Sequence, residues 1–258
     1  MPFIHHNGLR YFQFESLGKT RHAVFTRQGG VSPEPWSSLN VGGTVGDELG
    51  RVRENRRLSF HAVGRAPESV YDVWQVHSAD VVFASAPRAV DESYRQADII
   101  LTDTQDVTLF MRFADCVPIL LHDPRKGVVG VAHAGWMGTL RDAAAAAVEG
   151  MRRQYNSNPA DIIAAIGPSI GPDHYEIGAD VILQVMQKFG DESESVLQSN
   201  NGKIHFDLWR TNRLLLERAG VGQIEIAGIC TACHTDDWFS HRAEKGRTGR
   251  FGVLIALQ

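Results

Sequence analysis

The residues of this sequence best suited to bind a metal ion are His77, Cys116 and His133. A thiolate and two imidazoles suit Zn²⁺ or copper, and three protein ligands leave a fourth position free for water or substrate. The spacing is not that of a local motif, since 38 residues lie between His77 and Cys116 and 16 between Cys116 and His133. Spacing alone favours the alternative that the cysteine is a small buried residue and the histidines are ordinary core or surface groups. Only the fold can bring the three together.

A glycine-containing turn follows His133. The chain continues through Gly135 and Gly138 into an Ala-rich segment, so a strand, a turn and a helix N-terminus are expected in sequence. Free N–H groups and the dipole at such a terminus attract anions, which would place a phosphate beside the metal. An ordinary tight turn between a strand and a helix explains the same pattern.

Asp115 directly precedes Cys116 on an expected strand. Neighbouring side chains on a strand point to opposite faces, so the two residues are not expected to bind one metal together. We expect Cys116 to be the ligand. Asp115 either orients a neighbouring histidine or arginine, as carboxylates around metal sites do, or makes a structural hydrogen bond.

Cys230, Cys233 and His234 spell C-x-x-C-H, the attachment pattern of c-type haem. Covalent haem attachment normally goes with export, and residues 1–16 lack the basic region and apolar run of an export signal. One C-x-x-C pair is only half of a structural zinc site, so a redox dithiol or plain structural cysteines explain it better. The sequence assigns this motif no function.

Strands are predicted where β-branched and aromatic residues dominate short apolar runs. Several of these runs follow one another without a helix between them, so mixed or antiparallel sheets fit better than repeated strand-helix-strand units. The runs lie at residues 22–26, 97–102, 107–113, 117–122, 127–133, 161–167, 223–229 and 251–257.

Helices are predicted between the strands. In the second of them, Thr139 and Asp142 have the spacing of a capping box. Gly190 is expected to close the third helix, Asp207 to cap the start of the fourth and Gly220 to follow its end. The pattern predicts a mixed α and β protein that forms one continuous domain. The four helices are predicted at residues 48–64, 139–155, 179–190 and 207–220.

The composition excludes several classes of protein. Apolar residues make up 43% of the 258 residues and charged residues 22%, a balance that suits a packed core. The formal net charge of -4 gives no basic surplus for nucleic acid or anionic lipid. No stretch approaches the roughly 18 apolar residues of a membrane helix, and three cysteines are too few for a disulfide framework. We therefore expect a cytoplasmic protein without nucleic-acid or membrane partners.

Taken together, the ordered motifs resemble one known family over nearly the whole chain, from about His22 to Leu257. The family is the YfiH-like group of multicopper polyphenol oxidase (laccase domain) and purine nucleoside phosphorylase proteins, which is related to human FAMIN. The combination of A-D-C-x-P with H-A-G-W is the most specific part of the resemblance. The motifs are HAVFTRQGGVS, SLNVG, VGD, ENR, WQVH, ADCVPILL, AHAGWMGT, IGPSIGPDHYEIG and CTACHTDDWFSHRAEKGRTGRFG.

The resemblance implies an α+β fold with central mixed β-sheets flanked by helices, a single domain over residues 1–258. It implies that His77, Cys116 and His133 bind zinc and form the catalytic centre, with copper as a further metal. The implied reactions are phosphorolysis of adenosine, inosine and methylthioadenosine, and deamination of adenosine. The implied partners are a purine nucleoside and phosphate, with the chain acting as a monomer or homodimer.

The resemblance also suggests substrate contacts. Arg27, Asn40, Arg112 and Arg250 are candidates for substrate binding, although these residues and Gln75 equally suit structural roles at turns and strand ends. Many relatives carry arginine where this sequence has Met137, so any anion contact made there is either absent or supplied by another residue such as Arg112. At Asp173 relatives often carry cysteine, a change that leaves the three expected zinc ligands intact.

Three other functions compete with this interpretation. Copper-dependent oxidation of polyphenols is attributed to the same family, but the 11 histidines do not form the His-x-His pairs of multicopper sites. A hydrolase with Cys116 as nucleophile and His133 as base would not require a metal. A binding protein without catalytic activity would turn over no nucleoside.

Overall fold

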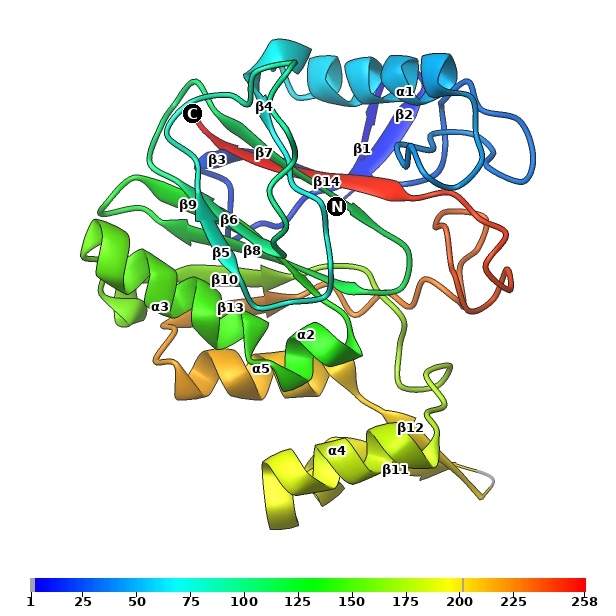
Figure 1. Cartoon of the computed structure of the whole chain (residues 1–258), viewed down its shortest axis with the longest axis vertical. Coiled ribbons are helices and arrows are strands. Elements are labelled where there is room, and N and C mark those ends of the chain that lie inside the picture. Colours follow the sequence, from blue (N-terminus) through cyan, green and yellow to red (C-terminus); the bar gives the residue numbers. More distant parts are fainter. Residues whose placement is uncertain (1–2, 201) are drawn as a thin grey trace.

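Two six-stranded sheets form the centre of the computed structural model, which describes residues 3–200 and 202–258 (Figure 1). Both sheets contain parallel and antiparallel pairs. In spatial order the first sheet contains β1 (Phe3–His6), β2 (Leu9–Phe12), β3 (Thr20–Phe25), β14 (Phe251–Leu257), β7 (Thr108–Phe113) and β4 (Val70–Tyr71). The second contains β13 (Gln223–Ile226), β10 (Ile163–Ile166), β8 (Val117–Asp123), β9 (Val128–Ala134), β6 (Ile99–Thr102) and β5 (Val81–Phe83).

The central strands are buried on both faces, and their side chains alternate between two cores. On β8, Ile119 and Leu121 face the helices, whereas Leu120 packs between the two sheets. On β14, Val253 packs between the sheets, whereas Leu254 faces the opposite side. A strand buried on both faces is a continuous apolar run in sequence, which is why these strands were predictable.

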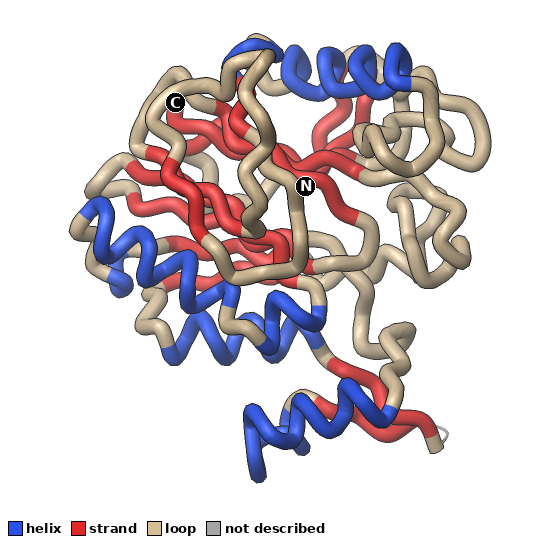
Figure 2. The backbone as a smooth tube through the Cα atoms, in the orientation of Figure 1, coloured by secondary structure: helices blue, strands red, loops and turns tan. Residues whose placement is uncertain are grey.

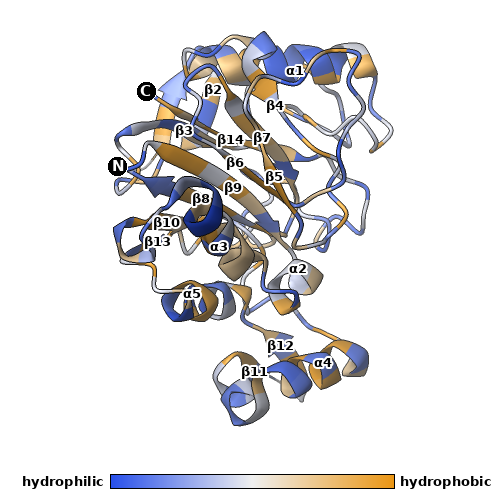
Figure 3. Cartoon of the chain, turned by 60° about the vertical axis from the view of Figure 1, so that its left-hand side comes forward, coloured by the Kyte–Doolittle hydropathy of each residue, from blue (hydrophilic) through white to orange (hydrophobic). Residues whose placement is uncertain are grey.

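Helices cover the outer face of each sheet, giving four layers (Figure 2). On the first sheet the ring of Phe60, in α1, lies 5.6 Å from that of Phe110. The second sheet is covered by α3 and α5, and Figure 3 shows the apolar residues gathered on the strands between these layers. The α-helices are α1 (Leu49–Ala62), α2 (Trp136–Leu140), α3 (Ala143–Tyr155), α4 (Ala179–Phe189) and α5 (Leu208–Arg218). The 3-10 helices are η1 (Pro67–Ser69), η2 (Pro159–Asp161) and η3 (Gly190–Ser195).

A small lobe projects from the layered body (Figure 1). It consists of α4 and the antiparallel pair β11 (Leu197–Asn200) and β12 (Lys203–Phe206). Its base is held by backbone hydrogen bonds from Ile177 to Ile204 and from Phe206 to Tyr175. The segment 167–178 therefore connects the body to the lobe.

The α+β class, with mixed sheets flanked by helices, is confirmed. All eight predicted strands form, and the ends of two helices are as expected. Gly190 closes α4, and the Asp207 carboxylate caps α5 by accepting from the Arg210 N–H. Gly220 follows α5 with φ +86°, a conformation that favours glycine. Short edge strands such as β1 and β5 lacked an apolar run long enough to be recognised.

The capping box predicted at Thr139 is wrong. Thr139 lies inside the short helix α2, and its hydroxyl is near the carbonyl of Ala134 and accepts from the Asn212 amide. Asp142 adopts φ 63°, which breaks the expected helix into α2 and α3. The spacing matched a capping box, but buried contacts with α5 decided the local structure.

Within the described ranges, every helix is too short or too polar to span a lipid bilayer.

The buried ring of His22, on β3, has a partner for each nitrogen in its neutral form. The Phe14 N–H donates to Nε2 at 2.9 Å, and Nδ1 lies 3.0 Å from the Thr20 hydroxyl, which itself donates to the Leu17 carbonyl. Nε2 therefore cannot take up a proton without losing its bond to Phe14. Burial lowers the pKa of His22 from 6.5 to about 4 against the opposing charge of Glu225.

As the pH falls from 7 to 5, we expect the free energy of unfolding to decrease by about 2 kcal/mol because of the titration of His22. Its stabilising effect is complete above pH 6.5 and is lost as the pH falls toward about 4, because the unfolded chain takes up the proton first. Urea unfolding of His22→Asn should therefore show a smaller loss over this range than wild type. The exposed His5→Asn is the control, and an unchanged pH dependence in His22→Asn would contradict the assignment.

Candidate metal centre

The three predicted metal ligands lie where the chain passes between the two sheets. His77 is in the segment 72–80, which runs from β4 in the first sheet to β5 in the second. Cys116 is in the bend 114–116, which joins β7 to β8 across the same two sheets. His133 is near the end of β9, directly before the turn into α2. Two crossovers and a strand end thus meet at one edge of the sheets.

The fold brings these residues together. Their donor atoms all lie within 4.8 Å of one another, and the Cys116 Sγ is 4.0 Å from the His77 Nε2. The two histidine rings are 5.0 Å apart between centroids. His133 is buried, while His77 and Cys116 are half-buried, so the centre is accessible from one side. One thiolate and two imidazoles are a donor set that fits Zn²⁺ and leaves a coordination position for a further ligand.

Asp98 orients His133 and was missed by the sequence analysis. Its Oδ1 lies 2.8 Å from the His133 Nδ1, which directs Nε2 toward the other ligands. Its Oδ2 accepts hydrogen bonds from the N–H groups of Val76 and Ser78, on either side of His77. Burial raises the pKa of Asp98, but His133 and these two N–H groups outweigh burial and lower the pKa. One carboxylate therefore positions two of the three ligands.

The backbone at His77 is strained, with φ 58° in a region that favours glycine. The two hydrogen bonds to Asp98 hold the peptides that flank it, and Arg141 donates to the His77 carbonyl at 2.7 Å. Strain of this kind costs roughly 1 to 3 kcal/mol and persists where surrounding contacts enforce it. Here it keeps the imidazole directed at Cys116.

The charges of Cys116 and His133 depend on each other. Burial raises the pKa of the Cys116 thiol, but the two histidines outweigh burial and lower the pKa. Burial lowers the pKa of His133, but Cys116 and Asp98 outweigh burial and raise the pKa. The pair therefore favours a thiolate beside an imidazolium, and metal binding would displace the proton from the imidazole.

Gly135 leaves room for the three ligands. A Cβ at this position would lie 2.7 Å from the Cys116 Sγ and 3.3 Å from the His77 Cδ2. The Cys116 Sγ, which is one of the three donor atoms, would therefore have to move.

We therefore expect Gly135→Ala to weaken zinc binding by at least about tenfold, since displaced ligands lose their geometry. Competition with a chromophoric chelator measures the affinity. Gly43→Ala, whose Cβ would make an ordinary 3.6 Å contact with Leu49, is the matched control. Wild-type affinity in Gly135→Ala would mean that the cluster does not bind the metal as a unit.

Asp115 does not lie on a strand, contrary to the expectation. It sits in the bend before β8 with φ 80°, and its carboxylate accepts from the Thr231 hydroxyl and the Arg242 N–H. It thus anchors the segment 228–250 beside Cys116 instead of orienting a histidine. Residues 114–116 form a bend between β7 and β8, so the alternation of side chains along a strand does not apply to Asp115 and Cys116.

Arg27, one of the predicted substrate contacts, is held by protein partners. It donates to the carbonyls of Ser37 and Thr235 and forms an ion pair with Glu244 at 3.0 Å. It lines a hollow of about 370 Å³ whose lining residues include none of the three metal ligands. A role in substrate binding stays a prediction for Arg27.

Asn40 and Arg112 also have protein partners. The fully buried amide of Asn40 donates to Asp47 and accepts from the backbone N–H of Arg250, so it joins two loops. The Arg112 Nε donates a hydrogen bond to the Gln75 Oε1, and the Arg112 Nη1 lies 3.6 Å from the Asp72 Oδ2. Both side chains stabilise the surrounding segments, and substrate binding stays a prediction for each of them.

Arg250 is better placed. Burial lowers the pKa of the Arg250 guanidinium, and this effect outweighs the negative charges of Cys116 and Asp115, which raise that pKa. Its Nη1 donates to the carbonyls of Thr248 and Gly249, while Nε and Nη2 have no hydrogen-bond partner within residues 3–200 and 202–258. Arg250 directly precedes Phe251, which pairs with Phe113 at the start of the bend 114–116, so it enters the sheet next to the bend that carries Cys116.

The turn after His133 differs from the expected anion site. The helix that begins there, α2, contains only five residues, because Asp142 separates it from α3. The dipole of so short a helix is small, so the expected attraction for phosphate loses most of its basis.

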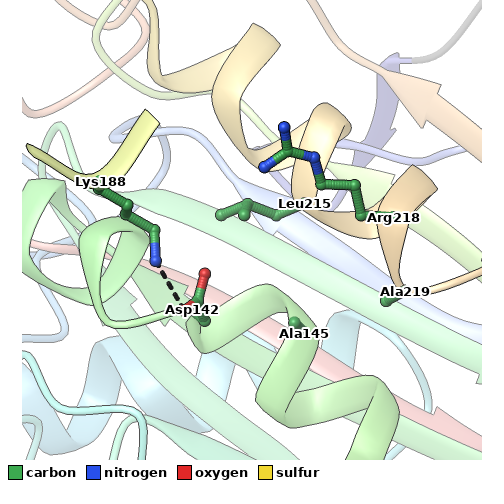
Figure 4. A pocket seen from close by; sticks show the side chains of 6 residues that line it. All are labelled: Asp142, Ala145, Lys188, Leu215, Arg218 and Ala219. Atoms are coloured by element: carbon green, nitrogen blue, oxygen red, sulfur yellow. Dashed lines mark hydrogen bonds and ion pairs between the residues drawn. The ribbon is translucent and has the colours of Figure 1, made fainter. Parts of the chain in front are cut away.

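A separate hollow of about 320 Å³ lies between α3, α4 and α5 (Figure 4). It contains an ion pair between Lys188 and Asp142 at 2.6 Å and includes none of the three metal ligands. The chemistry of the centre therefore does not extend into this hollow.

The chain is similar to known proteins over most of its length. Residues 21–258 match the family model described as multi-copper polyphenol oxidoreductase laccase. A purine nucleoside phosphorylase of Deinococcus radiodurans is 39% identical over 236 residues, 92% of this chain and 88% of that protein. The purine nucleoside phosphorylase YfiH of Escherichia coli is 34% identical, over 90% of this chain and 91% of that protein.

Solved structures show the same fold. The hypothetical protein YfiH of Bacillus licheniformis gives a TM-score of 0.92 at 32% identity, covering 100% of this chain and 99% of that one. YlmD of Geobacillus stearothermophilus gives the same TM-score, identity and coverage.

Proposed function

The chain belongs to the family described as multi-copper polyphenol oxidoreductase laccase, and we propose that it is a zinc-dependent purine nucleoside phosphorylase. Similar proteins from two other organisms carry the name purine nucleoside phosphorylase. The observation that carries the proposal is the convergence of His77, Cys116 and His133, two of which are positioned by Asp98. Adenosine, inosine and methylthioadenosine are the proposed substrates, and adenosine deamination is a second reaction of the same site. We also propose that residues 1–258 act as one domain.

Phosphorolysis forms a bond between a phosphate oxygen and C1′ of the ribose. The C1′–N9 bond breaks, and the purine takes up its electron pair and then a proton. The enzyme's task is to place the phosphate and to stabilise charge on the leaving purine. We assign Arg250 to the phosphate, because its Nε and Nη2 have no hydrogen-bond partner in the part of the chain that the structure describes. It also precedes Phe251, which pairs with Phe113 at the start of the bend that carries Cys116.

The protein residues around the centre hold fixed roles. His77, Cys116 and His133 would hold Zn²⁺, which when bound supplies a Lewis acid and activates water for deamination. Asp98 keeps the His133 Nδ1 occupied, so the opposite ring nitrogen stays available as a ligand. Asp115 keeps the segment that carries Arg250 against the bend that carries Cys116.

The test is product analysis with protein of known metal content. Incubation with inosine should release hypoxanthine and ribose 1-phosphate only when phosphate is present. Adenosine should give adenine with phosphate and inosine without it, if deamination shares the site. Base release that is independent of phosphate would contradict phosphorolysis.

Copper-dependent oxidation of polyphenols is a second candidate, because the family model carries that description. Copper-loaded protein should then consume oxygen with a catechol. If Cys116→Ala lost both phosphorolysis and polyphenol oxidation, the two activities would belong to one centre.

A further inference from the structure

A second group of metal-binding side chains lies outside the centre described above. Asp173, His174, Cys230 and Cys233 place one donor atom each within 4.8 Å of the others. The first two residues belong to the segment that leads to the small lobe, and the two cysteines belong to the segment that follows β13. The fold therefore joins the C-x-x-C pair to two ligands that lie 56 or more positions earlier in the chain.

The distances suit tetrahedral coordination. The Cys233 Sγ lies 3.0 Å from the Asp173 Oδ2 and 3.4 Å from the His174 Nδ1. The Cys230 Sγ lies 3.8 Å from the same Nδ1. Bonds of 2.0 to 2.3 Å from Zn²⁺ to nitrogen, oxygen and sulfur place tetrahedral ligands about 3.3 to 3.8 Å apart. Small shifts of two exposed side chains, Asp173 and Cys233, would therefore complete such a site.

The backbone around the cluster allows this close approach. The Gly171 N–H donates to the Cys230 Sγ at 3.2 Å, a bond that stabilises a thiolate. A Cβ at Gly171 would lie 2.5 Å from the Asp173 Oδ1 and 3.0 Å from the Cys230 Cβ, so a side chain at this position would crowd the cluster. Cys230 is buried, and the other three side chains are exposed, so an ion can enter from solvent.

A neighbouring charge balances the donor set. Two thiolates and a carboxylate around Zn²⁺ leave one net negative charge. The guanidinium of Arg242 reaches the cluster, donating to the carbonyls of His174 and Glu176 and lying 5.1 Å above the Tyr175 ring. This contact supplies a positive charge beside the ligands.

We propose that Asp173, His174, Cys230 and Cys233 bind a second Zn²⁺ ion as a structural site. Four protein donors fill a tetrahedral coordination shell, whereas the three donors of the first centre leave it open. The second ion would connect the base of the lobe to the segment 228–250. That segment also contacts Asp115, next to Cys116, and carries Arg250. The structural ion would thus support the segment that completes the first centre.

Zinc stoichiometry tests the proposal. Reduced protein is loaded with zinc, separated from free ions by gel filtration and analysed by mass spectrometry for metal. We expect two equivalents per chain in wild type and one in each of Cys233→Ser and His174→Ala, which change exposed residues. Cys116→Ala should also keep one equivalent, held by the second cluster, and Cys116→Ala with Cys233→Ser should keep none. His234→Ala, next to Cys233 but outside the cluster, is the matched control and should keep two.

Two further measurements do not depend on activity. Cobalt-loaded Cys116→Ala should show the sulfur-to-cobalt charge-transfer absorption of a thiolate site, and Cys116→Ala with Cys233→Ser should lose it. Chelation should lower the Tm of Cys116→Ala and leave that of the double variant unchanged. One equivalent in wild type that Cys116→Ala loses, two equivalents in Cys233→Ser, or a Cys230–Cys233 disulfide in protein kept under reductant would each overturn the proposal.

Discussion

Cys116→Ala is expected to lower kcat/KM for phosphate-dependent cleavage of inosine by about 10³-fold, the scale on which loss of a principal electrostatic group slows an enzyme. The thiolate is the only negatively charged donor among the three ligands, so its removal leaves two imidazoles that hold zinc weakly. Steady-state kinetics with inosine and phosphate measures the effect, and circular dichroism reports whether the variant remains folded.

Chelation separates this explanation from nucleophilic catalysis by Cys116. If zinc is required, a chelator abolishes wild-type activity and added zinc restores it, while the alanine variant responds to neither. If Cys116 is a nucleophile with His133 as its base, the metal-free enzyme is the active form. Full phosphorolysis by Cys116→Ala would exclude both roles.

Much of the layered fold was predictable, because its central strands are buried on both faces. Continuous apolar runs mark β8, β9 and β14 in the sequence, and glycine or aspartate marks the ends of α4 and α5. The short edge strands and the lobe pair β11–β12 have no such run. The break at Asp142 was unpredictable because it depends on contacts between α2 and α5 that form only in the folded protein.

The three metal ligands were identified by residue type and family resemblance, and their convergence is a property of the fold. Asp98 was missed because it lies within an apolar strand run and its partner, His133, is 35 positions away. The second cluster was missed because Cys230 and Cys233 alone make only half of a metal site. Their counterparts, Asp173 and His174, are adjacent to them only in space.

Three expectations from the sequence stay predictions. They are the cytoplasmic location, the choice between a monomer and a homodimer, and the single domain over residues 1–258. None of them enters the chemistry of the two metal clusters.

Asp98→Ala is expected to weaken zinc binding at the first centre by about 100-fold and to lower the free energy of unfolding by about 3 to 5 kcal/mol. The substitution leaves the His133 Nδ1 and the N–H groups of Val76 and Ser78 without their acceptor. His133 then loses its fixed orientation, and the strained backbone at His77 loses the contacts that enforce it. Chelator competition and urea unfolding of the metal-free protein measure the two effects.

Asp98→Asn distinguishes positioning from simple support of the fold. The amide fills the same space and retains one oxygen, so it should recover part of the stability. It cannot accept from His133 on one side and from the two backbone N–H groups on the other, so zinc affinity should stay low. Asp91→Ala, at an exposed position, should match wild type in both measurements. Recovery of zinc affinity in parallel with stability would reduce Asp98 to a structural residue, because orientation of His133 requires a carboxylate that accepts on both sides.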